Sequence, residues 1–259
     1  FYSAISNINL RIEDGNPIAV ALRTHYAQHG FVSHMNINTG KGKAGISEVG
    51  NELENVKFFG GDYGIIAGQT SPSWPVAMVD TYFESQRKAA IQCHNTGFAI
   101  VNMHARNVPV AVEIRENDTD RLFMEDCIFD NVKEAAIIIS REQHALTQVN
   151  LMNVVCRNVP VLALMRQSGE KIEPGMKMYR VQDFTYGLVV KDMETGSEYM
   201  NIKYFEPLNS FPASAERKIP SLPPMETWVN IKELGARGDG VTDDTRVFEE
   251  AIAKHKNIY

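Results

Sequence analysis

The chain has little of what several protein classes need. Three of its 259 residues are cysteine, and acidic residues outnumber basic ones by 32 to 26, which gives a net charge of −6. There is no basic stripe, so we expect no nucleic-acid partner. No apolar run approaches the roughly 18–20 residues that cross a bilayer, so we expect no membrane span. With 44% hydrophobic residues, the chain is typical of an ordinary globular protein with a large core.

The three cysteines, Cys93, Cys127 and Cys156, favour a structural role. Their number is odd, none forms a C-x-x-C pair, and each lies in or beside an apolar segment. We therefore expect buried free thiols rather than a disulfide or a metal site. The chain also has no zinc-ligand spacing, phosphate-binding loop or Ser-His-Asp order, so we expect no metal and no cofactor.

A degenerate repeat runs through residues 1–165. Clusters of small and aliphatic residues recur every 19 to 26 residues, with anchors at Ala21, Gly45, Gly64, Ala90, Ala111, Ala136 and Leu162. A second set of strand-like segments runs in step with them, at residues 4–10, 32–37, 53–59, 76–83, 98–104, 122–129 and 148–155. The clearest repeated sequence is Arg-Asn-Val-Pro, which occurs at Arg106-Asn107-Val108-Pro109 and again at Arg157-Asn158-Val159-Pro160.

Self-similarity at this period indicates a solenoid. Each repeat holds short alternating strands with Asn, Asp or Gly at the corners and no helix of ten residues, which excludes leucine-rich, ankyrin and helical-pair repeats. Stacked parallel strands fit because each coil buries its apolar side against the next. Loops at the corners, such as residues 69–75 and 115–120, explain the variable interval and are where function resides. We expect the acidic stretch 113–126 to be a solvated edge.

The repeat ends near residue 165. Glycines and prolines interrupt residues 166–206. Within them, apolar and polar residues alternate in segments 178–181 and 186–190, as in strands, and we expect a small antiparallel sheet there. Five prolines between residues 207 and 224 then indicate a stiff, extended linker. The expected organisation is the late coils of a β-helix over residues 1–165, a connector over 166–227, and the cap of a second β-helix over 228–259.

The run Gly238-Asp239-Gly240-Val241-Thr242-Asp243-Asp244-Thr245 follows an apolar strand and precedes an amphipathic segment. Its glycines suit a tight turn, and Thr242 and Asp243 are expected N-caps of the following helix. A turn and a helix start explain its acidic residues without calcium. The motif resembles the opening of a right-handed parallel β-helix of the pectate-lyase-like class. We therefore predict an all-β, right-handed parallel β-helix, and a further β-helix after Tyr259.

Two β-helices in tandem resemble glycoside hydrolase family 55, the β-1,3-glucanases. The likeness extends to the first domain, in Phe1-Tyr2-Ser3-Ala4-Ile5-Ser6-Asn7-Ile8, Ala27-Gln28-His29, Ser33-His34-Met35, Gly50-Asn51-Glu52 and Phe58-Phe59-Gly60-Gly61. The resemblance implies a polysaccharide or oligosaccharide substrate held between two β-helices, and hydrolysis with inversion. It places the general acid beyond Tyr259, so the remainder of the chain would be a partner and this part alone would be inactive. The substrate class implies a secreted or periplasmic protein.

Polar residues of the first β-helix would then hold the water and the terminal sugar. Gln28 and His29 follow the first strand pair, where an amide suits water positioning and either side chain could instead cap a corner. Ser47, Glu48 and Asn51 come one coil later, about 5 Å away if coils stack. Glu48 is a candidate base or hydroxyl ligand, or a solvated loop residue.

Trp74 lies in a proline-framed loop. Its ring could stack on the apolar face of a sugar or pack onto its own coil.

Two other functions remain open. A polyuronate lyase or hydrolase needs clustered cations or calcium for the substrate carboxylates, whereas this sequence scatters its basic residues. A non-catalytic glycan-binding β-helix would use the same fold only to present loops.

Overall fold

A computed structural model describes residues 3–25, 29–68, 75–194, 196–215 and 223–259. The chain divides into two compact units, Phe1–Glu216 and Arg217–Tyr259, here called unit 1 and unit 2. Gln28 and Trp74, two of the predicted site residues, lie outside the described residues.

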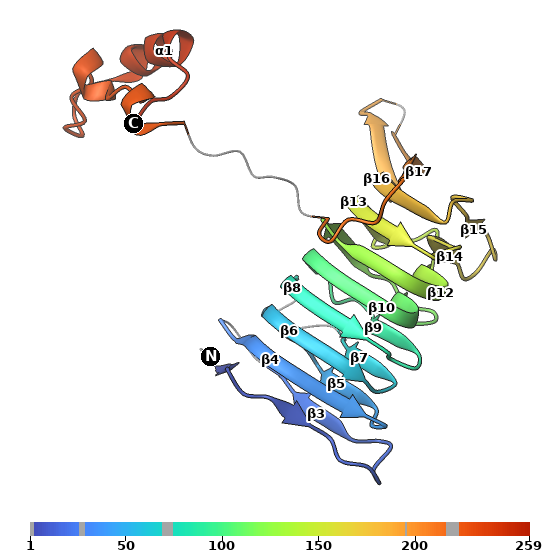
Figure 1. The fold of residues 1–259 in the computed structure, drawn as a ribbon. Helices are drawn as coiled ribbons and strands as arrows, with labels where there is room; N and C mark the ends of the chain where they lie inside the picture. The colour runs from blue at the N-terminus through green and yellow to red at the C-terminus, as the bar shows by residue number, and fades with distance from the viewer. Residues whose placement is uncertain (1–2, 26–28, 69–74, 195, 216–222) are drawn as a thin grey trace. The chain divides into compact units, whose positions relative to one another are not determined.

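Unit 1 is a right-handed parallel β-helix of about six turns, which confirms the predicted fold class (Figure 1). Each coil contributes to three parallel stacks of strands. Stack A contains β1 (Ala4–Ser6) and the first parts of β4 (Phe31–Gly40), β6 (Glu52–Gly60), β8 (Val76–Glu84) and β10 (Phe98–Ile114), then β11 (Arg121–Glu125) and the first part of β13 (Gln148–Arg157).

Stack B contains β2 (Leu10–Arg11), the later parts of β4, β6 and β8, the middle of β10, the start of β12 (Ile128–Ile139) and the end of β13. Stack C contains β3 (Val20–Arg23), β5 (Ala44–Ser47), β7 (Tyr63–Ile66), β9 (Ala89–Cys93), the ends of β10 and β12, and β14 (Ala163–Met165).

The bend between stacks A and B is made by one residue per coil in the left-handed conformation. The pairing register aligns these residues, whose φ angles lie between 50° and 58°, in one column: Asn7, His34, Asn55, Asp80, Asn102, Asp126 and Asn153. Asn and Asp tolerate this conformation better than other side chains. Their short side chains also bond along the column, since Asn102 Nδ2 donates to Asp80 Oδ1 at 2.7 Å.

A second left-handed column ends stack B. It contains Gly40, Gly60, Ser85, Asn107, Asn131 and Asn158, with φ angles between 52° and 71°. Asn131 Nδ2 donates to Asn107 Oδ1 at 3.1 Å, and Asn158 Nδ2 donates to Asn131 Oδ1 at 2.6 Å. The two repeated Arg-Asn-Val-Pro segments of the sequence therefore lie at equivalent corners of the β-helix.

Inward-facing side chains form one continuous core along the stacks. Those that are at most 1% exposed include Val32, Leu53, Met78, Ile100, Met124 and Leu151 from stack A, Ile37, Phe58, Phe83, Ala105, Phe129 and Cys156 from stack B, and Ile46, Ile65, Ile91, Val112, Ile137 and Ala163 from stack C. Small anchors leave room for large rings: a Cβ on Gly64 would lie 2.5 Å from Phe83 Cδ1. The anchors Gly45 and Gly64 thus sit where the rings of Phe58 and Phe83 leave no room for a Cβ.

The three cysteines belong to this interior, as predicted. All are buried free thiols, and burial raises the pKa of Cys127 and of Cys156 to about 12.

Antiparallel strands close the last coil of unit 1. β15 (Lys171–Ile172) pairs with β14, and β16 (Met178–Asp192) pairs with β13. β17 (Gly196–Pro207) then pairs with β16 as a hairpin (Figure 1). The two alternating segments of the sequence are therefore parts of one long strand, which covers the end of the core with Tyr179 and Phe184, both fully buried.

Unit 2 contains η1 (Met225–Thr227), η2 (Ile231–Leu234) and α1 (Thr245–Lys254), with a parallel bridge between Val229 and Ile258. The predicted N-caps were wrong by one or two residues, because α1 begins after Asp244. The Asp244 carboxylate instead accepts from the backbone N–H groups of Arg237 and Gly238, at 3.0 and 2.8 Å. The helices in the described parts of the chain include none with the length and apolar character to cross a membrane.

Candidate functional site: a groove at the coil corners

The candidate site lies at the corner between stack C of one coil and stack A of the next. The segments that join a stack C strand to the next stack A strand have four to nine residues, at 24–30, 48–51, 67–75, 94–97, 115–120 and 140–147, and we call them the corner loops; residues 26–28 and 69–74 within them are not among the described residues. Their variation accounts for the uneven repeat interval. Every predicted site residue falls in or next to the first three of these loops.

A groove of about 480 Å³ opens at this corner, and we call it the corner groove. It is lined by Val20, Thr24, His25, Lys43, Ser47, Glu48, Val49, Gly50, Ile66, Ala67, Gly68, Gln92, His94 and Arg115. The ends of β3, β5, β7 and β9 provide its floor, so a rigid parallel sheet positions its side chains. Two of the predicted residues, Ser47 and Glu48, line it.

Glu48 is held as a carboxylate. Arg23 donates to it through two nitrogens, at 2.8 and 2.7 Å, and His25 Nδ1 lies 3.5 Å from its Oε2. The hydrogen bond from Arg23 keeps the pKa of Glu48 below its usual range. Glu48 is therefore ionised at neutral pH, which suits it to accept a sugar hydroxyl and not to donate a proton.

Ser47 and Gln92 offer acceptors and donors to the groove. The Ser47 hydroxyl has no hydrogen-bond partner among the described residues, and Ser47 is half-buried. Gln92 Nε2 donates to Tyr63 Oη at 3.1 Å and to Glu113 Oε2 at 2.9 Å. Because both amide hydrogens are used, the Gln92 carbonyl oxygen remains as the group that can accept from a ligand.

Gln92 is positioned by an ion pair from a distant coil. Arg166 donates to Glu113 Oε1 at 2.8 Å, across 53 residues of sequence. Glu113 thus accepts from Arg166 and Gln92 at once. The expectation that the stretch 113–126 is simply a solvated edge was wrong here, because stacking brings Arg166 onto this carboxylate.

The same stretch contains a second buried carboxylate, Asp120, which is 1% exposed. It accepts from the backbone N–H groups of Thr96, Gly97 and Arg121, at 3.3, 2.6 and 2.8 Å. Asp120 therefore ties two neighbouring corner loops together.

Two cationic side chains that lie far apart in the sequence, Lys43 and Arg115, also line the groove. Arg115 pairs with Asp118 at 2.6 Å, whereas the Lys43 ammonium has no partner among the described residues. His94 Nε2 lies so close to Gly68 that a Cβ there would be 2.7 Å from it. Lys43, Gln92 and His94 were missed because their shared location depends on the stacking register, which no local pattern reveals.

The other predicted residues lie outside the corner groove. His29 and Asn51 line a neighbouring hollow of about 440 Å³ together with Phe31 and Glu52. Both have left-handed backbone conformations, with φ angles of 57° and 54°. The structure thus separates His29 and Asn51 from Ser47 and Glu48, while Gln28 and Trp74 lie outside the described residues.

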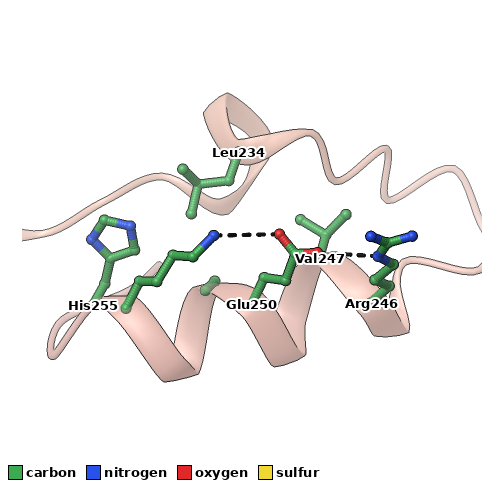
Figure 2. Close-up of a pocket in the computed structure, with 7 residues that line it drawn as sticks. Leu234, Arg246, Val247, Glu250 and His255 are labelled. Atoms are coloured by element: carbon green, nitrogen blue, oxygen red, sulfur yellow. Dashed lines mark hydrogen bonds and ion pairs between the residues drawn. The ribbon is translucent and has the colours of Figure 1, made fainter.

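Unit 2 has a smaller pocket of about 230 Å³ between η2 and α1 (Figure 2). Leu234, Val247 and Ala251 form its apolar part. Glu250, which lines this pocket, accepts from Arg246 and Lys254, at 3.1 and 3.5 Å. Both bonds join residues one helical turn apart, so the charges are explained by the helix itself.

Within the described residues, no group of three or more His, Cys, Asp or Glu side chains could hold a metal ion. No family model and no curated protein matches the chain. The fold is that of the parallel β-helix proteins, a fold compatible with action on polysaccharides.

Proposed function

We propose that unit 1 binds a β-1,3-glucan in the corner groove and supplies the half of an inverting glycoside hydrolase that holds the sugar and the water. The observation that carries this proposal is the meeting of Ser47, Glu48 and Gln92 in one groove of a parallel β-helix. The first-domain resemblance to family 55 supports the choice of glucan. A protein with this substrate would act outside the cytoplasm, as a secreted or periplasmic protein.

The chemistry divides the roles. An inverting hydrolase needs a general acid at the leaving oxygen and a general base that takes a proton from the water on the opposite face of the sugar. Glu48 is paired with Arg23 and ionised, and it is the sole carboxylate among the described residues that line the groove. The proposal therefore gives Ser47 and Gln92 the water and a sugar hydroxyl, makes the ionised Glu48 the base that takes the proton of the attacking water, and assigns the general acid, which protonates the leaving oxygen, to residues outside the groove.

Titration of the chain with a β-1,3-linked glucose hexasaccharide, followed by calorimetry, tests the binding step. We expect saturable binding that the double variant Ser47→Ala, Gln92→Ala weakens at least about tenfold, equivalent to about 1.4 kcal/mol. Ser197→Ala, on the exposed hairpin strand β17, is the matched control and should bind as the unaltered chain does. Equal binding by the double variant would refute this use of the groove.

Hydrolysis is tested on the longest natural form of the protein. Laminarin-type glucan at neutral and mildly acidic pH should release sugar whose first-formed anomer is inverted, as followed by NMR. Glucan left intact by that protein would count against the hydrolase and leave only a binding role.

One observation favours a second candidate, a polyuronate-acting protein. Lys43 and Arg115 both line the corner groove, and cationic side chains of this kind bind carboxylates. Replacing the glucan by a galacturonate hexasaccharide in the same titration separates the two. Tighter binding of the uronate, lost in Lys43→Met and weakened by salt, would reverse the order of the candidates.

A further inference from the structure

A second pocket lies on the outer face of stack B, away from the loops of the corner groove. It has a volume of about 340 Å³, and its lining includes Tyr82, His104, Arg106, Asp130, Arg157 and Phe211. We call it the ring pocket. Its volume falls in the range of small-molecule sites, about 300–1,000 Å³.

The segment after β17 builds one wall of the ring pocket. Phe211 lies over the Arg157 guanidinium, with 4.0 Å between the guanidinium carbon and the ring centroid. Ala215 and Leu208 pack on Ile128 and Val155, which face outward from stack B. Asn153 Nδ2 also donates to the Ala215 carbonyl at 2.7 Å. The wall is therefore fixed to the last coils before any ligand arrives.

Aromatic rings form the floor. The centroids of Tyr82 and His104 are 6.4 Å apart, and Phe59 supports Tyr82 from the preceding coil at 5.9 Å. Tyr82 and His104 are half-buried, so part of each ring faces the pocket. The Tyr82 hydroxyl donates to Glu84 Oε2 at 3.0 Å, which fixes the ring on its strand.

Planar charged groups stand beside these rings. Arg157 donates to both oxygens of Asp130, at 2.8 and 2.6 Å, and the Asp130 side chain is 8% exposed. Arg106 lies between Glu84 and Asp130, at 3.8 and 3.7 Å, and its side chain is 50% exposed. Both separations exceed hydrogen-bond distance, and Arg106 also interacts with the Tyr82 hydroxyl. A guanidinium carries five N–H donors, so the remaining ones are available to a ligand, and the Asp130 carboxylate can accept.

We propose that the ring pocket is a second glycan-binding site, which holds one sugar residue of a glucan chain on Tyr82 and His104. A sugar presents an apolar C–H face, which fits an aromatic ring, and edge hydroxyls, which fit adjacent carboxylate and guanidinium groups. Arg106 donates to one hydroxyl, and Asp130, which also lines the pocket, accepts from a neighbouring hydroxyl. The choice of a glucan rests on the function proposed for the corner groove.

The test uses the whole chain and the β-1,3-linked glucose hexasaccharide. We expect two binding events by calorimetry, together with ligand-induced shifts of the Tyr82 and His104 ring signals in NMR spectra. Tyr82→Ala and Arg106→Gln should each weaken one event at least about tenfold, equivalent to about 1.4 kcal/mol. Tyr204→Ala removes a tyrosine that is 62% exposed on β17 and should leave both events unchanged.

Loss of binding in Tyr82→Ala could come from misfolding. Arg106→Gln separates the two causes, because this exposed side chain contributes nothing to the core and the variant is expected to fold. A single binding event that the Ser47→Ala, Gln92→Ala variant removes and Tyr82→Ala preserves would overturn the ring pocket alone. A single binding event that Tyr82→Ala removes and the Ser47→Ala, Gln92→Ala variant preserves would support the ring pocket and refute the corner groove. Binding at neither place would overturn both proposals.

Discussion

Unit 1 buries side chains from every coil in one continuous core, whereas unit 2 buries few. Among the described residues of unit 2, the buried apolar ones are Ala236 and Ala251, at 9% and 2% exposed. Phe248 and Ile252 on α1 are 47% and 70% exposed. Unit 1 is therefore stabilised by burial between coils, and unit 2 by hydrogen bonds that fix its turns.

Because the two units are stabilised differently, a substitution is expected to lower the stability of unit 1 more than that of unit 2. In a solenoid each coil contacts its neighbours, so one missing side chain weakens two interfaces. In unit 2 the carboxylates of Asp239 and Asp244 accept from backbone N–H groups near the helix start. Such bonds are local and exposed to water, so each contributes less.

The largest contrast is expected for the same substitution in the two units. Phe83→Ala removes a fully buried ring that stacks on Phe58, with centroids 4.6 Å apart, and should lower the free energy of unfolding of unit 1 by about 3–5 kcal/mol. Phe248→Ala, on α1, should cost about 1 kcal/mol or less. Urea denaturation followed by circular dichroism measures both. Equal costs would refute the contrast between the units.

Buried and exposed carboxylates give the next comparison. Asp120→Ala leaves three backbone N–H groups without their acceptor, of which those of Thr96 and Gly97 are buried, and should cost about 2–3 kcal/mol. Asp244→Ala removes two similar bonds at an exposed turn and should cost about 0.5–1 kcal/mol. Thermal unfolding of both variants checks the order. A milder effect at Asp120 would mean that water reaches the 94–97 corner.

The sequence predicted the coils of unit 1 well because its signals are local. Small residues such as Gly64 and Ala90 recur where rings need room, and Asn131 and Asn158 recur where the backbone turns left-handed. Each signal reports a steric requirement of its own residue. The strand positions and the corner loops follow from these signals.

The groove could be predicted only in part, because it depends on contacts between coils. Ser47 and Glu48 were found from their polarity in a corner. Gln92 and Lys43 were not, because the loop lengths set the register that brings them together. The Glu113–Arg166 pair spans two further coils, and its partners share no pattern in the sequence.

A smaller effect is expected at the left-handed columns. Asn131 has a φ of 56°, so Asn131→Ala should cost about 1–2 kcal/mol through backbone strain and the lost side-chain bonds. Asn131→Gly keeps the conformation accessible and should cost less than the alanine variant. Denaturation midpoints of the pair separate strain from hydrogen bonding. If the glycine variant is as unstable as the alanine variant, the lost stability comes from the side-chain hydrogen bonds along the column and not from backbone strain.

The smallest effect is expected in the turn of unit 2 and depends on pH. Asp239 accepts from the backbone N–H of Thr242 and Val241, at 2.7 and 2.9 Å, and these bonds lower its pKa. A lowered folded-state pKa stabilises the turn above the ordinary aspartate pKa of about 3.9, and that contribution is lost as the pH falls through the lowered value.

The Thr242 amide resonance should therefore titrate with a midpoint below about 3.9. In Asp239→Asn this titration should disappear, because the amide side chain carries no charge. Ring signals of Phe58 and Phe83 are the internal reference, since these side chains are fully buried in unit 1 and are expected to stay unchanged through the Thr242 transition. A midpoint at or above about 3.9 would show that these hydrogen bonds do not favour the ionised carboxylate, and unit 2 would then need another source of order at its turn.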